Sequence, residues 1–161
     1  MNEHGVSEPG STEQGATRFS WPVRVYWEDT DAGGIVYYAN YLKFMERART
    51  EWLRARGVEQ VDLKDRENVM FVVVRAEADF RMPARYGDLL QVTCEVSGST
   101  RASITFRQDV VRPGTDTSAD TGAEELLVTG SVRIACLDAS RFRPRPLPEM
   151  VLQEIGVGGK R

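Results

Sequence analysis

Three acidic residues within four positions form the segment of this sequence best suited to chemistry. Glu28, Asp29 and Asp31 precede the pair Gly33-Gly34, and a helical pattern begins a few residues further on. A carboxylate held in a loop that leads into a helix can act as a general base or as a nucleophile. The first N–H groups of a helix lack partners within it, so they can stabilise a negatively charged oxygen. This segment is therefore the candidate catalytic site.

The same acids have plainer interpretations. Carboxylates are favoured near a helix start by its dipole alone, so Glu28, Asp29 and Asp31 are also consistent with a solvated loop. Asp29, which alternates with Asp31, is expected to pair with an arginine or to cap a turn. A metal site is not expected, because no second acid cluster completes a ligand set and the one histidine, His4, lies near the N-terminus.

A strand and a long helix flank the acidic loop. Residues 21–27 alternate between apolar and polar side chains, with the period of a β-strand. Residues 40–57 show helical spacing, with Asn40 as the expected N-cap and Gly57 just past the C-terminal end. The predicted apolar side of this helix consists of Tyr41, Phe44, Met45, Ala48, Trp52 and Ala55.

Further strands are predicted after the helix. Residues 69–80 begin as a continuous apolar run from Val69 to Val74, which is typical of a strand buried on both faces. Residues 90–97, 101–111 and 126–136 alternate with a period of two, and Gly130 is a candidate β-bulge. Residues 82–88 indicate a turn and 113–123 a long hairpin loop. One helix beside an antiparallel sheet is an α+β arrangement, with the helix across the concave face of a curved sheet.

Length and composition describe one ordinary globular domain. The chain has 161 residues, is 41% hydrophobic and 28% charged, and carries a formal net charge of -3. This charge gives no argument for nucleic acid as a partner, and no apolar run is long enough for membrane insertion. Cys94 and Cys136 fall at inward strand positions, so two reduced thiols are favoured over a disulfide. No signal peptide is recognisable, so a cytoplasmic location is expected.

The two ends differ in composition from the middle of the chain. Residues 1–18 are rich in Gly, Ser, Glu and Thr and hold few apolar side chains, so a disordered segment is expected there. The tail 156–161 is predicted to be flexible on the same grounds. Residues 19–155 are then the folded domain.

The run from Trp21 to Tyr37, continued from Asn40 to Glu51, resembles a known family. It is similar to hotdog-fold acyl-CoA thioesterases of the 4-hydroxybenzoyl-CoA thioesterase family, and in particular to the branch associated with the Tol-Pal system. The similarity continues through 71–73 and 83–85 to 143–148. The resemblance implies a hotdog fold for residues 19–155, in which a curved antiparallel sheet wraps around one long helix.

The resemblance also implies roles for residues of the acidic loop. Asp31 matches the family's catalytic carboxylate, and the backbone N–H of Tyr38 matches the group that contacts the thioester carbonyl oxygen. Gly34 and Tyr37 are the other substrate-binding candidates. The residues agree with these roles, because Gly33-Gly34 permits a sharp turn and Tyr38 lies where N–H groups lack helical acceptors. Many members of the Tol-Pal branch instead carry a catalytic histidine at position 38.

The implied function is hydrolysis of small acyl-CoA thioesters, with short-chain or aromatic acyl groups, to a free acid and CoA. No metal or separate cofactor is expected, because coenzyme A is part of the substrate. The missing histidine leaves a second hypothesis, a non-catalytic hotdog binding or scaffold protein of the Tol-Pal cell-envelope system. Hotdog dehydratases rely on a histidine, so this chain fits them less well.

Partners and assembly follow from the same resemblance. Arg75, Arg81 and Arg85 are either a solvated strand face or ligands of the CoA phosphates. The family implies a homodimer or homotetramer with the active site at the dimer seam, and proteins of the Tol-Pal system or of lipid synthesis as candidate partners. The sequence is consistent with assembly, since the run from Val69 to Val74 is too apolar for a solvated edge.

Overall fold

The computed structural model describes residues 18–114, 116–117 and 120–156. The segments 1–17 and 157–161, predicted to be disordered and flexible, lie outside these residues. Arg18, the last residue of the predicted disordered segment, is described and donates to Asp109 Oδ2 at 2.7 Å. The elements are β1 (Ser20–Arg24), a 3-10 turn (Trp27–Asp29), α1 (Asn40–Arg54), α2 (Gln60–Glu67), β2 (Val69–Phe80), β3 (Leu89–Thr93), β4 (Glu95–Thr100), β5 (Ser103–Arg112), β6 (Asp116–Thr117), β7 (Asp120–Thr121), β8 (Glu125–Asp138), β9 (Arg143–Pro144) and α3 (Glu149–Glu154).

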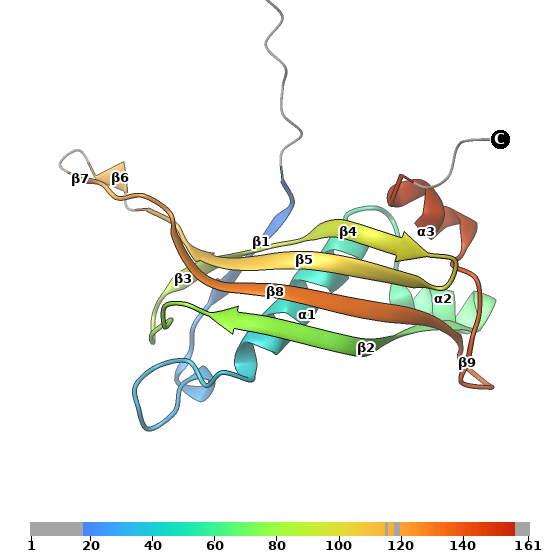
Figure 1. Cartoon of the computed structure of the whole chain (residues 1–161), viewed down its shortest axis with the longest axis horizontal. Helices are drawn as coiled ribbons and strands as arrows, with labels where there is room; N and C mark the ends of the chain where they lie inside the picture. Colours follow the sequence, from blue (N-terminus) through green and yellow to red (C-terminus); the bar gives the residue numbers. More distant parts are fainter. Residues whose placement is uncertain (1–17, 115, 118–119, 157–161) are drawn as a thin grey trace, which may run out of the picture.

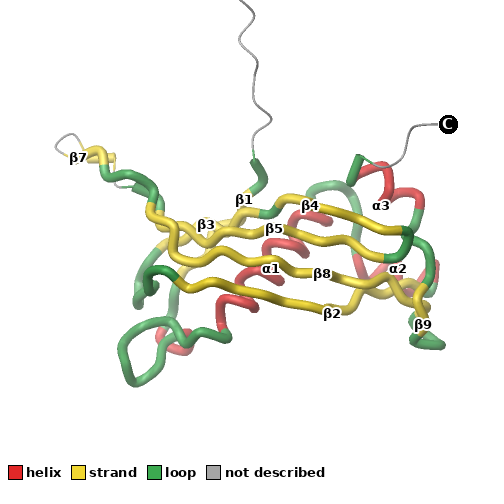
Figure 2. The backbone as a smooth tube through the Cα atoms, in the orientation of Figure 1, coloured by secondary structure: helices red, strands yellow, loops and turns green. Residues whose placement is uncertain are grey.

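A single antiparallel sheet forms the body of the molecule, and α1 lies against one of its faces (Figure 1). The strands follow the order β1-β3-β5-β8-β2, while β4 pairs with β5 and β9 with β8. Figure 2 shows α1 crossing the strands diagonally behind the sheet. This arrangement confirms the predicted α+β hotdog architecture.

The apolar side of α1 builds the core. Tyr41, Phe44, Met45, Ala48 and Trp52 are all buried, as the helical spacing predicts. They pack against inward-facing side chains of the central strands, among them Ile104, Phe106, Val110, Val128 and Val132. Burial of this many apolar side chains is the main force that holds α1 on the sheet.

The start of α1 differs from the prediction. Asn40 is the first helical residue, and the N-cap is Ala39, which makes no side-chain cap. The predicted cap at Asn40 is wrong because its side chain is used elsewhere. The Asn40 Nδ2 donates to the carbonyl oxygen of Asp29 at 2.9 Å. The residue therefore joins the helix to the acidic loop instead of capping the helix.

Two short helices were not predicted from the sequence. In α2 only Leu63 is buried, and in α3 only Val151, so neither has the repeated apolar spacing that marks a helix. The predicted strand also ends early. Trp27 lies in the 3-10 turn and stacks on Tyr86, with ring centroids 4.1 Å apart. In the part of the chain that is described, no helix is long and apolar enough to cross a membrane.

The apolar strand β2 lies at the edge of the sheet, which corrects one prediction. The run from Val69 to Val74 was expected to be buried on both faces. Val73 and Val74 are instead 53% and 49% exposed, and β8 is the neighbour that pairs with β2. The sequence of this run correctly shows that the strand is apolar, but it does not show which surface covers the strand.

Gly130 marks a close approach of two elements and not the predicted bulge. It pairs in unbroken register with Ala78 and with Gln108. A Cβ at this position would lie 2.6 Å from Met45 Cε. The glycine therefore lets α1 approach the sheet, and the register shift in β2 lies between Val73 and Arg75.

Cys94 and Cys136 are buried free thiols, in agreement with the prediction. Burial raises the pKa of Cys94 to about 12 and also raises the pKa of Cys136. Both side chains therefore stay protonated at neutral pH and belong to the core.

Candidate active site

Asp31 lies in a tight turn that its own side chain helps to form. Its N–H donates to the Ile35 carbonyl at 3.1 Å, and its carbonyl accepts the Gly34 N–H at 3.0 Å. The Gly33 N–H donates to Asp31 Oδ1 at 2.8 Å. Gly34 has φ 74°, a left-handed conformation that favours glycine. The Gly-Gly pair thus closes the turn and fixes one oxygen of the exposed Asp31 carboxylate.

Asp29 is the structural acid of the loop. It is buried, and its Oδ2 accepts the Tyr26 N–H at 2.8 Å. Its carbonyl oxygen accepts two further bonds, from the Tyr37 N–H at 2.9 Å and from Asn40 Nδ2 at 2.9 Å. Asp29 therefore caps a turn, one of its two predicted roles, and it ties the loop to the start of α1.

Tyr38 presents an unused backbone donor at the N-terminal end of α1. No described residue accepts its N–H, although the N–H of Tyr37 beside it is bonded. The Tyr37 and Tyr38 rings lie 4.8 Å apart. The pKa of the Tyr37 phenol is raised, first by the Tyr38 hydroxyl and last by the negative charge of Asp31. Tyr37 therefore lies close enough to Tyr38 and to Asp31 for both to act on its phenol.

An apolar cavity of about 280 Å³ borders this loop. One wall is the loop that carries Asp31, and the other is the end of β2 with the turn that follows it. Apart from Arg81, the lining side chains are uncharged: Ile35, Val36, Tyr38, Tyr41, Phe80, Met82 and Pro83. The turn that carries Asp31 reaches this mostly apolar cavity through Ile35, and Tyr38 lines it directly.

Backbone contacts hold the acidic loop against the turn after β2. The Val36 N–H donates to the Ala84 carbonyl at 2.9 Å, and the Ala84 N–H donates to Tyr41 Oη at 3.0 Å. Tyr41 is buried in α1, and burial is the first cause that raises the pKa of its phenol. Ala84 consequently joins the loop to the helix.

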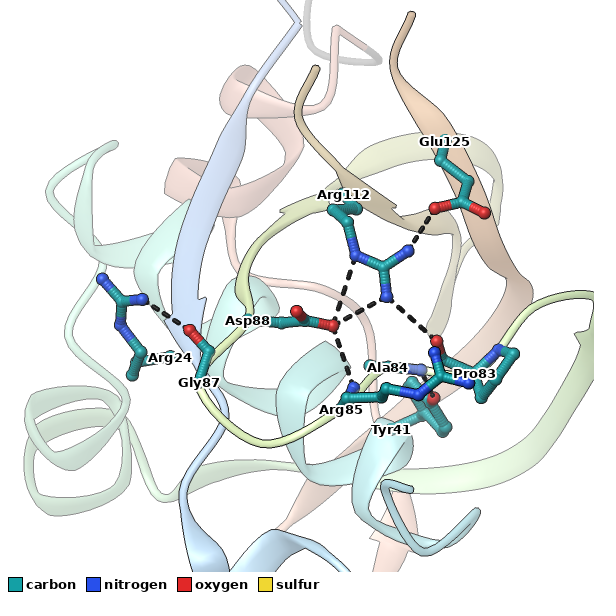
Figure 3. A network of polar contacts seen from close by, with 9 residues as sticks. All are labelled: Arg24, Tyr41, Pro83, Ala84, Arg85, Gly87, Asp88, Arg112 and Glu125. Carbon is teal, nitrogen blue, oxygen red and sulfur yellow. Dashed lines mark hydrogen bonds and ion pairs between the residues drawn. The ribbon is translucent and has the colours of Figure 1, made fainter. Parts of the chain in front are cut away.

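Arg112 of β5 anchors that turn through Asp88, which lies at the end of the turn (Figure 3). Arg112 Nη2 donates to Asp88 Oδ2 at 2.7 Å and to the Pro83 carbonyl at 3.0 Å, and Arg112 Nη1 pairs with Glu125. Asp88 Oδ2 also accepts the Arg85 N–H at 2.9 Å. The bond to Asp88 is the first cause that raises the pKa of Arg112.

This network was not predicted from the sequence. Asp88 follows Arg85 by three residues in a predicted turn, which is a usable sign of a side chain that caps the turn. No local pattern links Asp88 to Arg112, because the two meet only when β5 joins the sheet.

The three arginines considered as ligands of the CoA phosphates lie in different surroundings. Arg81 lines the cavity, whereas Arg75 is exposed and pairs with Glu77 at 2.6 Å. Arg85 is exposed and contributes its N–H to the Asp88 turn. No group of three His, Cys, Asp or Glu side chains that could hold a metal ion occurs among the described residues.

Comparisons with known proteins place the whole domain in a family. The family model for the thioesterase-like superfamily matches residues 25–155. The acyl-CoA thioester hydrolase YbgC of Escherichia coli O6:H1 is 40% identical over 139 residues, which cover 86% of this chain and 96% of that protein. The 1,4-dihydroxy-2-naphthoyl-CoA hydrolase of Nostoc punctiforme is 30% identical over 137 residues, 84% of each chain.

A solved structure supports the same conclusion. The probable thioesterase from Bartonella henselae is 32% identical, with a TM-score of 0.72 over 82% of this chain and 100% of that one. The predicted resemblance to the hotdog thioesterases and their YbgC-type branch is confirmed. This chain, from its antiparallel sheet to the acidic loop before α1, belongs to the thioesterase-like superfamily.

Proposed function

We propose that this protein is an acyl-CoA thioesterase that hydrolyses small acyl-CoA thioesters, with short-chain or aromatic acyl groups, to a free acid and CoA. The observation that carries the proposal is the position of the Asp31 turn and the unused Tyr38 N–H beside one apolar cavity. The family and the names of its related members support the reaction class.

Asp31 supplies the reactive carboxylate in this proposal. As a general base, it takes a proton from a water molecule whose oxygen attacks the thioester carbon, and CoA leaves as the thiol. As a nucleophile, it forms a mixed anhydride with release of CoA, and water then hydrolyses the anhydride. The bond from the Gly33 N–H holds Oδ1, so Oδ2 is the oxygen available for either role.

The Tyr38 N–H acts on the carbonyl oxygen of the thioester. Negative charge develops on that oxygen during attack, and a donor already in place stabilises it by about 3 kcal/mol. The position just before α1 adds the favourable field of the helix dipole. Gly34 shapes the turn, and the exposed Tyr37 beside Tyr38 is the further substrate contact in this proposal.

The volume of the cavity indicates the size of the acyl group of the substrate. A volume of about 280 Å³ is near the lower end for ligand pockets, which suits a short or aromatic acyl group. The proposed chemistry needs no metal or redox group, and CoA enters only as part of the substrate.

The proposal includes assembly through β2. Its exposed Val73 and Val74 lie on an open strand edge, which favours pairing with a second copy. A homodimer or homotetramer would place another chain beside the Asp31 loop. The cytoplasm as compartment rests on the composition of the sequence, and proteins of the Tol-Pal system or of lipid synthesis as partners rest on the family resemblance alone.

The decisive experiment is Asp31→Asn, assayed by release of free thiol from a panel of acyl-CoA thioesters. Asparagine keeps the size of the side chain but cannot act as base or nucleophile, so turnover should fall at least about 100-fold. Glu28→Gln is the matched control, because Glu28 is an exposed acid of the same segment, and it should keep wild-type activity. Wild-type turnover by Asp31→Asn would exclude the proposed role of Asp31, and a wild-type protein that hydrolyses no thioester of the panel would favour the scaffold hypothesis.

A further inference from the structure

Asn40 is a buried polar residue at the start of α1, between the acidic loop and the core. Its side chain belongs to a residue that is only 8% exposed, although asparagine is mostly a surface residue. An asparagine at a helix start ordinarily accepts a hydrogen bond from the first N–H groups of the helix. Here Asn40 Nδ2 instead donates to the carbonyl oxygen of Asp29, at 2.9 Å. The structure therefore uses this side chain as a donor toward the loop.

The Asp29 carbonyl oxygen accepts two donors from the segment that leads into α1. One is Asn40 Nδ2, and the other is the Tyr37 N–H, which also lies at 2.9 Å. The Asn40 N–H donates in turn to the Tyr37 carbonyl at 2.9 Å. Tyr37 and Asn40 are thus bonded both to Asp29 and to each other. These three bonds restrain the two ends of the segment 37–40.

Tyr38 lies inside this restrained segment. Its N–H has no acceptor among the described residues, while the residues at both ends of the segment are bonded. A donor stabilises a developing oxyanion best when it is already oriented, because no reorganisation is then needed during the reaction. The orientation of the Tyr38 N–H therefore depends on the bond that Asn40 supplies. All of these bonds form within one chain, so they do not depend on a second copy at β2.

We propose that Asn40 is a positioning residue of the active site, which acts through the Asp29 carbonyl to orient the Tyr38 N–H toward the thioester oxygen. Asn40 does not itself touch the substrate. Because the Tyr38 N–H has this task only in the proposed function, the role of Asn40 rests on that function. Only a donor can fill this role, since the group that Asn40 Nδ2 meets is a carbonyl oxygen.

The first experiment compares the steady-state kinetics of the wild type, Asn40→Ala and Thr30→Val on one acyl-CoA. Asn40→Ala should lower kcat about tenfold with little change in KM, because a misdirected N–H stabilises the transition state less. Thr30→Val is the matched control and should keep the wild-type kcat. The Thr30 hydroxyl also bonds a carbonyl of the acidic loop, that of Trp27 at 2.8 Å, but it does not bond that of Asp29.

A double-mutant cycle tests whether Asn40 acts through Tyr38. Tyr38→Pro already lacks the N–H, so the addition of Asn40→Ala to this variant should lower kcat no further. Two losses of kcat that multiply in the double variant would show that Asn40 acts by another route, and this result would overturn the proposal. Circular dichroism on each variant checks that the protein is folded.

NMR of the backbone amides gives a second readout that needs no turnover. In Asn40→Ala the Tyr37 amide proton should shift upfield, because its acceptor at Asp29 is held less firmly, and in Thr30→Val it should not. Asn40→Asp separates this role from helix capping, since aspartate is an equally good cap and suits the helix dipole. An ionised carboxylate cannot donate to the Asp29 carbonyl, so Asn40→Asp should show the same upfield shift. An unshifted Tyr37 amide in both Asn40 variants would overturn the proposal.

Kinetics and NMR together separate a failure of this role from a failure of the proposed function. A wild type that hydrolyses acyl-CoA, with Asn40→Ala as active as Thr30→Val, would contradict the positioning role alone. A wild type that hydrolyses no acyl-CoA would contradict the proposed function. A Tyr37 amide that still responds to Asn40 in such an inactive protein would make Asn40 a structural residue only, and the positioning role would then be wrong as well.

Discussion

At the scale of single residues, substitutions of Tyr38 can test the contribution of its backbone N–H to activity separately from that of its side chain. The N–H has no acceptor among the described residues, while the ring is 62% exposed beside Phe80. Tyr38→Phe and Tyr38→His should therefore keep most of the activity. Tyr38→Pro removes the donor itself and should reduce kcat by about 10²–10³-fold. The assay is thiol release from one acyl-CoA, with circular dichroism to check folding. Loss of activity in Tyr38→Phe would show instead that the hydroxyl takes part.

The two glycines of the Asp31 turn should respond differently to alanine. A Cβ on Gly33 would lie 3.0 Å from Asp31 Oδ1, so Gly33→Ala should move the carboxylate and lower kcat about tenfold. Gly34 has open space around it but φ 74°, so Gly34→Ala should lower the free energy of unfolding by about 1–2 kcal/mol. Steady-state kinetics and urea denaturation on both variants measure the contrast. Equal effects on kcat and stability in both variants would contradict this division.

These residues could be predicted from the sequence because the acidic loop is a local motif. The Gly-Gly turn and the helix after it follow from residues close together in the chain; the structure contains both, with the helix N-cap at Ala39 instead of Asn40. Asp29 is the exception in detail, since two roles were open and only the folded loop shows that it caps a turn. Arg49 is buried and donates to Gln108 Oε1 at 2.8 Å, which the sequence did not indicate because a charged residue on a helix is normally solvated.

At the scale of elements, the turn after β2 depends on one arginine from β5. Arg112→Met removes the donors to Asp88 and to the Pro83 carbonyl, so the turn that carries Ala84 should loosen. We expect a loss of about 1–2 kcal/mol in the free energy of unfolding and a lower kcat, because the Asp31 loop is bonded to Ala84.

Arg24→Met is the control for this prediction. Arg24 is exposed and bonds the same turn only through the Gly87 carbonyl at 2.6 Å. It should change stability and kcat little. Thermal denaturation and kinetics measure both variants, and an Arg112→Met protein with unaltered kcat would show that the network is not needed to position the loop.

The elements with a clear apolar pattern could be predicted from the periodicity of their apolar residues and from the turn residues between them. The helix α1 and the long strands were found because each alternates or repeats over many residues. The helices α2 and α3 were missed because each buries a single side chain. Gly130 was assigned to a bulge because a sequence cannot show that Met45 packs against that position.

At the scale of the whole molecule, the open edge of the sheet predicts assembly. We expect light scattering to find a homodimer at least, and a dimer of dimers is the larger form that the family resemblance implies. Val74→Lys places a charge on the exposed edge and should shift the protein toward monomers with lower activity. A fully active monomer of 18.1 kDa at assay concentration would contradict the assembly prediction.

The matched control for the edge is Val61→Lys. Val61 is also an exposed valine, at 63%, but it lies on the helix α2 and not on the edge strand. It should leave both the oligomeric state and the activity unchanged. The position of β2 could not be predicted from its sequence, because an apolar strand looks the same whether its own chain or a second copy covers it.

The unbonded N–H of Tyr38 also has a consequence for exchange with solvent. Two adjacent amides of this loop differ sharply, since the Tyr37 N–H is held by the Asp29 carbonyl at 2.9 Å and the Tyr38 N–H meets no acceptor among the described residues. In deuterated water the Tyr38 amide should exchange early and the Tyr37 amide late. A bound carbonyl group would slow the exchange at Tyr38 without breaking any bond within the loop. In the proposed mechanism, this N–H is free to donate to the thioester oxygen without first losing a bond within the protein.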